Sequence, residues 1–167
     1  MIYIAIMLAA PPSSGCQAPV PVEHAHVASK YGPRQRFKNF RKEMHKGVDF
    51  ASPAGTPIRS LYRGRVSAVV SHPWHGNTVS VVTFKPGGKQ LMIIYHHLKD
   101  IHVREGELVM VGNIVGTVGK TGTDEGPHLH LETLIRNYRK GTKFRNVPPN
   151  SILNLCKYDY KKHDYYR

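Results

Sequence analysis

From Pro57 onward, the chain is a series of short apolar runs interrupted by glycines, and this pattern constrains the fold more than any other feature. The runs are too short for a helix of three turns and are rich in Val, Ile and Thr, which favour strands. Residues Thr78–Phe84 alternate at period two, and Gln90–His96 repeat the pattern after a Lys-Pro-Gly-Gly-Lys segment suited to a hairpin turn. The sequence therefore predicts an all-β fold, a small antiparallel β-sheet or sandwich.

Further strands are expected over one extended stretch at 57–61 and 64–70, and over 108–111, 114–118 and 128–134. No part of the sequence has the apolar spacing of an amphipathic helix of three turns. At 167 residues, the chain has the length of one ordinary domain.

The two ends of the chain differ from its centre in composition. Residues 1–16 have a short apolar run followed by Ser-Ser-Gly-Cys, and are expected to be an export leader or a lipoprotein-like signal. Membrane attachment is expected only if Cys16 is lipidated, since the run is shorter than the roughly 20 residues that cross a bilayer. Residues 17–26 are expected to be a linker, 27–150 the functional domain, and 151–167 a basic, tyrosine-rich tail.

A strong positive charge narrows the partners without identifying them. Twenty-four Lys and Arg against eleven Asp and Glu give a formal net charge of +13, which attracts polyanions. The sequence lacks an aromatic RNP segment and zinc-finger spacing, so nucleic acid is not an expected partner. Two cysteines, Cys16 and Cys156, are too few for a disulfide framework or a cysteine-rich zinc site.

A histidine and a carboxylate four residues apart, His45 and Asp49, form the first candidate site. In a straight strand their side chains would share a face about 13 Å apart, too far for ligands of one ion. The segment is therefore expected to bend, and Gly47 permits this. Helical spacing would also bring the pair together, but Gly47, Pro53 and Gly55 disfavour a helix. A surface salt bridge is the simpler alternative.

The second candidate is His128 with His130, which share a face if the segment is a strand. Two histidines and one carboxylate are typical of catalytic zinc, which takes three protein ligands and keeps one position open. Spacing alone does not choose between His128 and His130 as the ligand. It also does not choose between His96 and His97, although alternation along a strand should let only one of these two face the site.

Several motifs together resemble the LytM/lysostaphin-type zinc metallopeptidases, the M23 family, which act as peptidoglycan endopeptidases. They occur in the family's order between about residues 27 and 132. The matching segments are Ser29–Arg34, His45–Ala51, Pro53–Pro57, Tyr95–Leu98, Gly119–Gly122 and Gly126–Glu132.

The resemblance implies a β-sheet domain of the LytM type with an open groove. It implies one Zn²⁺ ion bound by His45, Asp49 and His130, with His97 and His128 as unliganded catalytic histidines. Glu132 is two residues from His130, so in a strand its side chain points to the same face and is a candidate to orient the His130 ring. Arg34 is a candidate to line the groove and bind a peptide carboxylate.

The expected function is zinc-dependent hydrolysis of peptide cross-links in bacterial peptidoglycan. The expected partners are peptidoglycan stem peptides and anionic wall or envelope polymers. Such a protein would be exported to the periplasm or cell envelope, or held there as an outer-membrane lipoprotein. The alternative is a catalytically inactive, wall-binding regulator of another hydrolase, although such relatives typically lack a zinc ligand and this sequence keeps all three.

Overall fold

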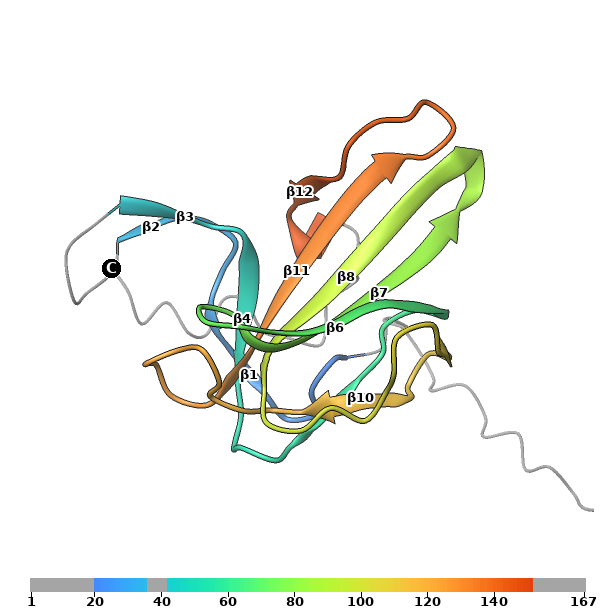
Figure 1. Cartoon of the computed structure of the whole chain (residues 1–167). Coiled ribbons are helices and arrows are strands. Elements are labelled where there is room, and N and C mark those ends of the chain that lie inside the picture. Colours follow the sequence, from blue (N-terminus) through green and yellow to red (C-terminus); the bar gives the residue numbers. More distant parts are fainter. Residues whose placement is uncertain (1–19, 36–41, 152–167) are drawn as a thin grey trace, which may run out of the picture.

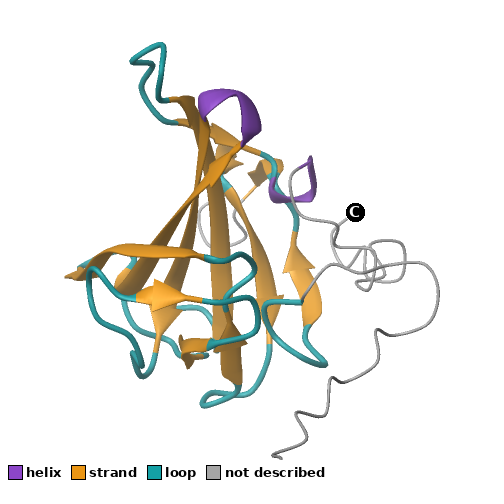
Figure 2. Cartoon of the chain, turned by 90° about the vertical axis from the view of Figure 1, so that its right-hand side faces the viewer, coloured by secondary structure: helices purple, strands orange, loops and turns teal. Residues whose placement is uncertain are grey.

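The computed structural model describes residues 20–35 and 42–151, and nearly all of its regular structure is β-strand. Every strand pair is antiparallel, which confirms the predicted fold class. Figure 2 shows strands and loops throughout, with two short 3₁₀ turns, η1 (Pro86–Gly88) and η2 (Pro149–Ser151). In the described part of the chain, no helix has the length and apolar character needed to cross a membrane.

One eight-stranded sheet forms the body of the domain, in the order β1-β4-β11-β8-β7-β6-β9, with β12 also paired to β11. Figure 1 shows β7, β8 and β11 as long neighbouring strands. The strands of this sheet are β1 (His26–Ser29), β4 (Gly47–Ala51), β6 (Gly64–His72), β7 (Gly76–Lys85), β8 (Lys89–Leu98), β9 (Leu108–Val109), β11 (His128–Asn137) and β12 (Arg145–Val147).

Two small sheets complete the fold. One pairs β2 (Gly32–Gln35) with β3 (Lys42–His45), and the other pairs β5 (Pro57–Arg59) with β10 (Ile114–Thr117). The prediction of one extended stretch through 57–70 is wrong, because β5 and β6 belong to different sheets. The predicted hairpin between β7 and β8 is present, and Gly87 takes a positive φ of 75° in its turn.

Strict alternation along the central strands gives the sheet two unlike faces. Leu91, Ile93 and Tyr95 on β8 are fully buried in the apolar core, as are Leu129 and Leu131 on β11. The residues between them point to the opposite face, because successive side chains in a strand alternate. That second face carries His96 on β8, and His128, His130 and Glu132 on β11. The same strands therefore supply both the core and the polar face.

The packed domain begins before the predicted boundary. Val22 is fully buried in the core and bridges to Ile58, and the Arg59 backbone N–H donates to the Pro21 carbonyl. The prediction of a linker over 17–26 is therefore wrong for residues 20–26, whose proline-rich composition hid two buried contacts. The predicted leader, Cys16 and residues 152–167 of the predicted tail lie outside the described residues.

The buried hydroxyl of Tyr95 gives a test of this core. It accepts a hydrogen bond from the Leu61 backbone N–H at 3.1 Å, and burial raises its pKa to about 12. The substitution Tyr95→Phe keeps the ring but leaves that N–H unpaired, so the free energy of unfolding should fall by about 1–3 kcal/mol. Urea denaturation measures this. Tyr138→Phe, at a largely exposed tyrosine, is the control and should change stability by less than about 0.5 kcal/mol.

Candidate metal centre

Three side chains from three strands meet at one end of the polar face. Asp49 on β4 pairs directly with His130 on β11, and His45 ends β3 just before the chain turns into β4. The His45 Nε2 atom lies 3.2 Å from Asp49 Oδ1 and 3.0 Å from His130 Nδ1. His130 Nδ1 lies 2.6 Å from the same Asp49 oxygen. The predicted bend between His45 and Asp49 is present, and all three side chains are buried.

The outer hydrogen bonds of the two imidazoles determine which nitrogens face inward. His45 Nδ1 lies 2.6 Å from the Lys30 carbonyl oxygen and must donate to it, because a carbonyl only accepts. The neutral ring then directs the lone pair of Nε2 at Asp49. His130 Nε2 lies 3.3 Å from Glu132 Oε1 and donates to it. The neutral His130 ring then directs the lone pair of Nδ1 at Asp49. Two nitrogen lone pairs and a carboxylate oxygen thus converge, and a cation placed between them would satisfy all three.

The donor set is suited to a metal ion. Two imidazole nitrogens and one carboxylate oxygen are typical ligands of catalytic zinc. His45, Asp49 and His130 have ligand atoms close enough together to hold one ion. Glu132 lies beyond His130 as expected, where a hydrogen bond of this kind fixes the ring orientation of a ligand.

The shifted pKa values of Asp49 and His130 also indicate that this cluster favours a positive charge. Burial alone would raise the pKa of Asp49, but hydrogen bonds from His130 and His45 lower it well below its usual range. Burial alone would lower the pKa of His130, but its hydrogen bonds to Asp49 and Glu132 raise it to about 9. Without a metal, a proton on His130 therefore supplies positive charge beside Asp49.

Gly47 allows β4 to pass close to the His130 ring. A Cβ atom at this position would lie 2.5 Å from the Leu131 carbonyl oxygen and 2.6 Å from Cε1 of His130. Both distances are far below van der Waals contact, so any larger residue would displace the strand or the ring. This close approach is a second reason for a glycine between His45 and Asp49, in addition to the bend.

Two further histidines face the cluster from its open side. The rings of His97 and His128 have centroids 4.8 Å apart, and His128 Nε2 lies 3.9 Å from Asp49 Oδ1. Each ring donates from Nδ1 to a carbonyl oxygen at 2.8 Å, that of Thr121 for His97 and that of Gly126 for His128. The neutral rings therefore keep an unprotonated Nε2. Burial lowers the pKa of His97 to about 4, so this ring is neutral near pH 7.

The expectation that His96 and His97 point to opposite faces of the sheet is wrong, although only His97 lies beside His128 at the open side of the cluster. His96 pairs with His130 across β8 and β11, and their ring centroids lie 5.3 Å apart. His97 takes a left-handed φ of 63°, and the β7–β8 register shifts beside it. Its ring consequently lies on the same side, 6.0 Å from that of His130. Strand alternation could not reveal this, because it assumes regular backbone.

Arg34 lies at the site but contacts the protein's own carboxylates. Its Nη1 donates to Asp49 Oδ2 at 3.1 Å, and its Nε donates to Glu43 Oε1 at 2.9 Å. The predicted role in binding a peptide carboxylate is therefore less suitable than a role in orienting Asp49.

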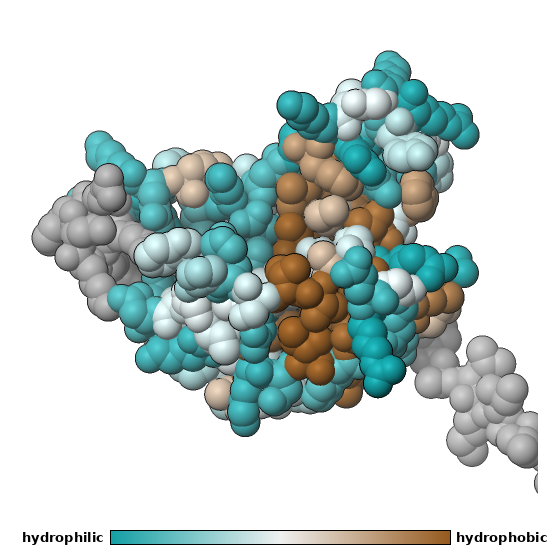
Figure 3. Space-filling model, viewed as in Figure 1, coloured by the Kyte–Doolittle hydropathy of each residue, from teal (hydrophilic) through white to brown (hydrophobic). Residues whose placement is uncertain are grey.

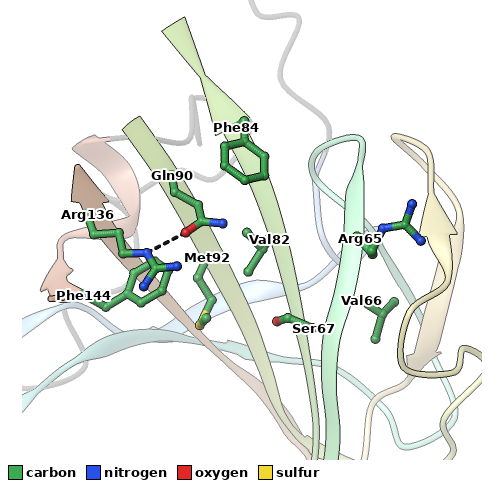
Figure 4. Close-up of a pocket in the computed structure, with 9 residues that line it drawn as sticks. All are labelled: Arg65, Val66, Ser67, Val82, Phe84, Gln90, Met92, Arg136 and Phe144. Atoms are coloured by element: carbon green, nitrogen blue, oxygen red, sulfur yellow. Dashed lines mark hydrogen bonds between the residues drawn. The ribbon is translucent and has the colours of Figure 1, made fainter. Parts of the chain in front are cut away.

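The polar face continues along β8 and β11 to a shallow hollow at the far end of the sheet. Figure 4 shows its side chains, with Arg136 Nε donating to Gln90 Oε1 at 2.6 Å. The guanidinium also lies over the Phe144 ring, 4.3 Å from its centroid. Met92 on β8 and Val82 on β7 form part of the lining of this hollow. In Figure 3, apolar surface gathers in the middle of the molecule and hydrophilic surface surrounds it.

Comparisons with known proteins agree with this geometry. The Peptidase family M23 model matches residues 43–144. Peptidoglycan DD-endopeptidase ShyB of Vibrio cholerae is 35% identical over 120 residues, which are 71% of this chain and 27% of that protein. Lysostaphin of Staphylococcus simulans is 33% identical over 106 residues, which are 63% of this chain and 21% of that protein.

Solved structures show the same fold. A zinc-containing peptidase from Vibrio cholerae matches with a TM-score of 0.63 and 34% identity, over 77% of this chain and 37% of that one. The catalytic domain of lysostaphin matches with a TM-score of 0.63 and 27% identity, over 77% of this chain and 91% of that domain. The chain spans only about a quarter of the length of the curated relatives such as ShyB. Since the family model covers more than half of the sequence, this chain belongs to peptidase family M23.

Proposed function

We propose that this protein is a zinc-dependent endopeptidase that hydrolyses peptide cross-links in bacterial peptidoglycan. The observation that carries the proposal is the convergence of His45, Asp49 and His130, with His97 and His128 beside them. Relatives named as peptidoglycan DD-endopeptidases support the substrate, and the family supports a metal-dependent peptidase.

His45, Asp49 and His130 would hold the zinc ion. When bound, zinc supplies Lewis acidity, which polarises a carbonyl oxygen and makes water more acidic. Arg34 holds the second oxygen of Asp49, and Glu132 holds the outer nitrogen of His130, so both ligands are oriented before the ion binds.

His97 and His128 would move protons. With Nδ1 of each ring held by a carbonyl, Nε2 of a neutral ring can accept a proton from the attacking water as general base. The other ring, once protonated, can donate to the developing oxyanion, and either can later protonate the leaving amine.

Peptidoglycan lies outside the cytoplasm, so the proposal requires export to the periplasm or cell envelope. The sequence of residues 1–16 supports an export leader, and Cys16 a lipid anchor. The net charge of +13 supports additional attraction to anionic envelope polymers. The inactive-regulator alternative has less support, because the described residues keep all three proposed ligands and both further histidines.

The decisive experiment compares wild type with Asp49→Ala. Wild-type protein should bind about one zinc ion tightly and convert cross-linked muropeptides of purified sacculi to monomers. Asp49→Ala removes a ligand and should lose both the tight zinc and the activity. Metal analysis and chromatography of the released muropeptides measure the two effects. Zinc binding without any cleavage by wild type would favour the regulator, and activity retained in Asp49→Ala would disprove the site.

Substitution of the unliganded histidines should separate chemistry from metal binding. His97→Ala and His128→Ala should each retain the tight zinc but lower kcat about 100-fold or more, because each removes a proton-transfer group. His102→Ala, at an exposed histidine outside the cluster, is the matched control and should keep wild-type kcat. Loss of zinc in His97→Ala or His128→Ala would instead mean that the ring is a ligand.

The hollow at Arg136 gives a test of substrate binding. It lies six residues beyond His130 along β11, or roughly 20 Å, which is within reach of a stem peptide of several residues. We propose that Arg136, whose Nε bond to Gln90 leaves four N–H donors, binds a carboxylate of that peptide. Arg136→Gln should raise KM about tenfold with kcat nearly unchanged. Lys140→Gln removes an equal charge from the same region and should leave KM unchanged.

A further inference from the structure

A second group of potential metal ligands lies on the outer side of His130. It consists of His96, Glu132 and the outer nitrogen of His130, whose ligand atoms all lie within 4.8 Å of one another. His96 is 6% exposed, and the Glu132 side chain is 14% exposed. None of the roles proposed above uses His96.

The hydrogen bonds of Thr78 accommodate a His96 ring that is protonated at Nδ1. The Thr78 hydroxyl lies 3.2 Å from the Gly76 carbonyl oxygen and donates to it. In that arrangement it accepts from Nδ1 of His96, which lies 3.1 Å away. In this tautomer the neutral His96 ring carries its lone pair on Nε2, which lies 4.0 Å from Glu132 Oε1.

That nitrogen has no hydrogen-bond partner among the described residues, although it is buried. It lies 4.0 Å from Glu132 Oε1, beyond hydrogen-bond distance, and both atoms are acceptors. A buried acceptor without a partner is costly, so such an atom calls for a specific explanation, and a bound ion is one. A cation between the two atoms would satisfy both.

Glu132 is held in position for this role. Its Oε2 accepts from Asn146 Nδ2 at 3.2 Å, and its Oε1 accepts from His130 Nε2 at 3.3 Å. A carboxylate oxygen has two lone pairs, so Oε1 can keep the bond to His130 and also bind an ion. His130 can therefore remain a ligand of the first site while Glu132 serves the second.

His75 is the nearest further imidazole. Its ring centroid lies 4.7 Å from that of His96, on the exposed turn between β6 and β7. The His97 backbone N–H donates to the His75 carbonyl oxygen at 3.0 Å, which holds this turn against β8. His75 lies beside His96 on this exposed turn, and its side chain would have to turn toward Glu132 to supply a third nitrogen.

We propose that His96, Glu132 and His75 form a second site for a divalent transition metal such as Zn²⁺, adjacent to the His45–Asp49–His130 site. Imidazole and carboxylate ligands suit Zn²⁺, Cu²⁺ and Ni²⁺. The second site is the weaker of the two, because His75 is exposed and must be ordered when the ion binds. The two sites share the hydrogen bond between Glu132 and His130.

Titration of the metal-free full-length protein with ZnCl₂, followed by calorimetry and metal analysis, tests the proposal. Wild type should bind two equivalents, one tight and one weaker. His96→Gln should bind only the tight equivalent, and Asp49→Ala only the weaker one. His102→Gln, which removes an exposed histidine elsewhere, is the matched control and should bind two.

Glu132→Gln provides an independent variant, because the amide oxygen can still accept from His130. It should lose the weaker equivalent and keep a cooperative thermal transition. A single equivalent in wild type would overturn the second site and leave the proposed endopeptidase activity standing. A weaker equivalent that survives in both His96→Gln and Glu132→Gln would also overturn it, by placing the ion elsewhere on the chain.

Discussion

The antiparallel pairing of β4 with β11 sets the register on which both the core and the candidate metal centre depend. His130 lies opposite Asp49 in this ladder, and Leu131 lies opposite Val48. The first pair faces the site and the second faces the apolar core. Because side chains alternate, a slip of one residue would turn the ligands into the core and leucines into the site. Burial of the apolar residues thus selects the one register in which the ligands meet.

Backbone carbonyls around the centre determine what the histidines can do. Lys30, Thr121 and Gly126 each accept a hydrogen bond from Nδ1 of one ring. These residues lie in segments between the strands, so the loops fix the orientation of imidazoles that the strands position. Each neutral ring then directs Nε2 at the cluster, whereas His130 is reversed because Glu132 holds its Nε2.

Much of the fold could be predicted because its long strands carry a clear alternation. Residues 78–84 and 90–96 lie within β7 and β8, and residues 128–134 lie within β11. The short strands β1, β2, β3 and β12 have three or four residues each and little alternation, so their sequences gave no signal. Val22 was missed for a related reason, since a proline-rich segment can still bury one side chain.

The residues of the candidate site were predicted more completely than their environment. The order of the motifs along the sequence singled out five residues, and the structure brings all five together: His45, Asp49, His97, His128 and His130. The placement of His97 on the same face as His96 depends on one left-handed residue and a shifted register, which propensity cannot reveal. The ion pair of Arg34 with Asp49 is likewise a tertiary contact between residues 15 positions apart.

The candidate ligands also come from widely separated parts of the chain. His45 and His130 are 85 residues apart, and β11, which carries the second, pairs with both β4 and β8. The ribosome synthesises the chain from its N-terminus to its C-terminus, so a growing polypeptide has no complete ligand set until residue 130 has emerged. The order of the residues along the chain therefore delays assembly of the centre until most of the domain has been synthesised.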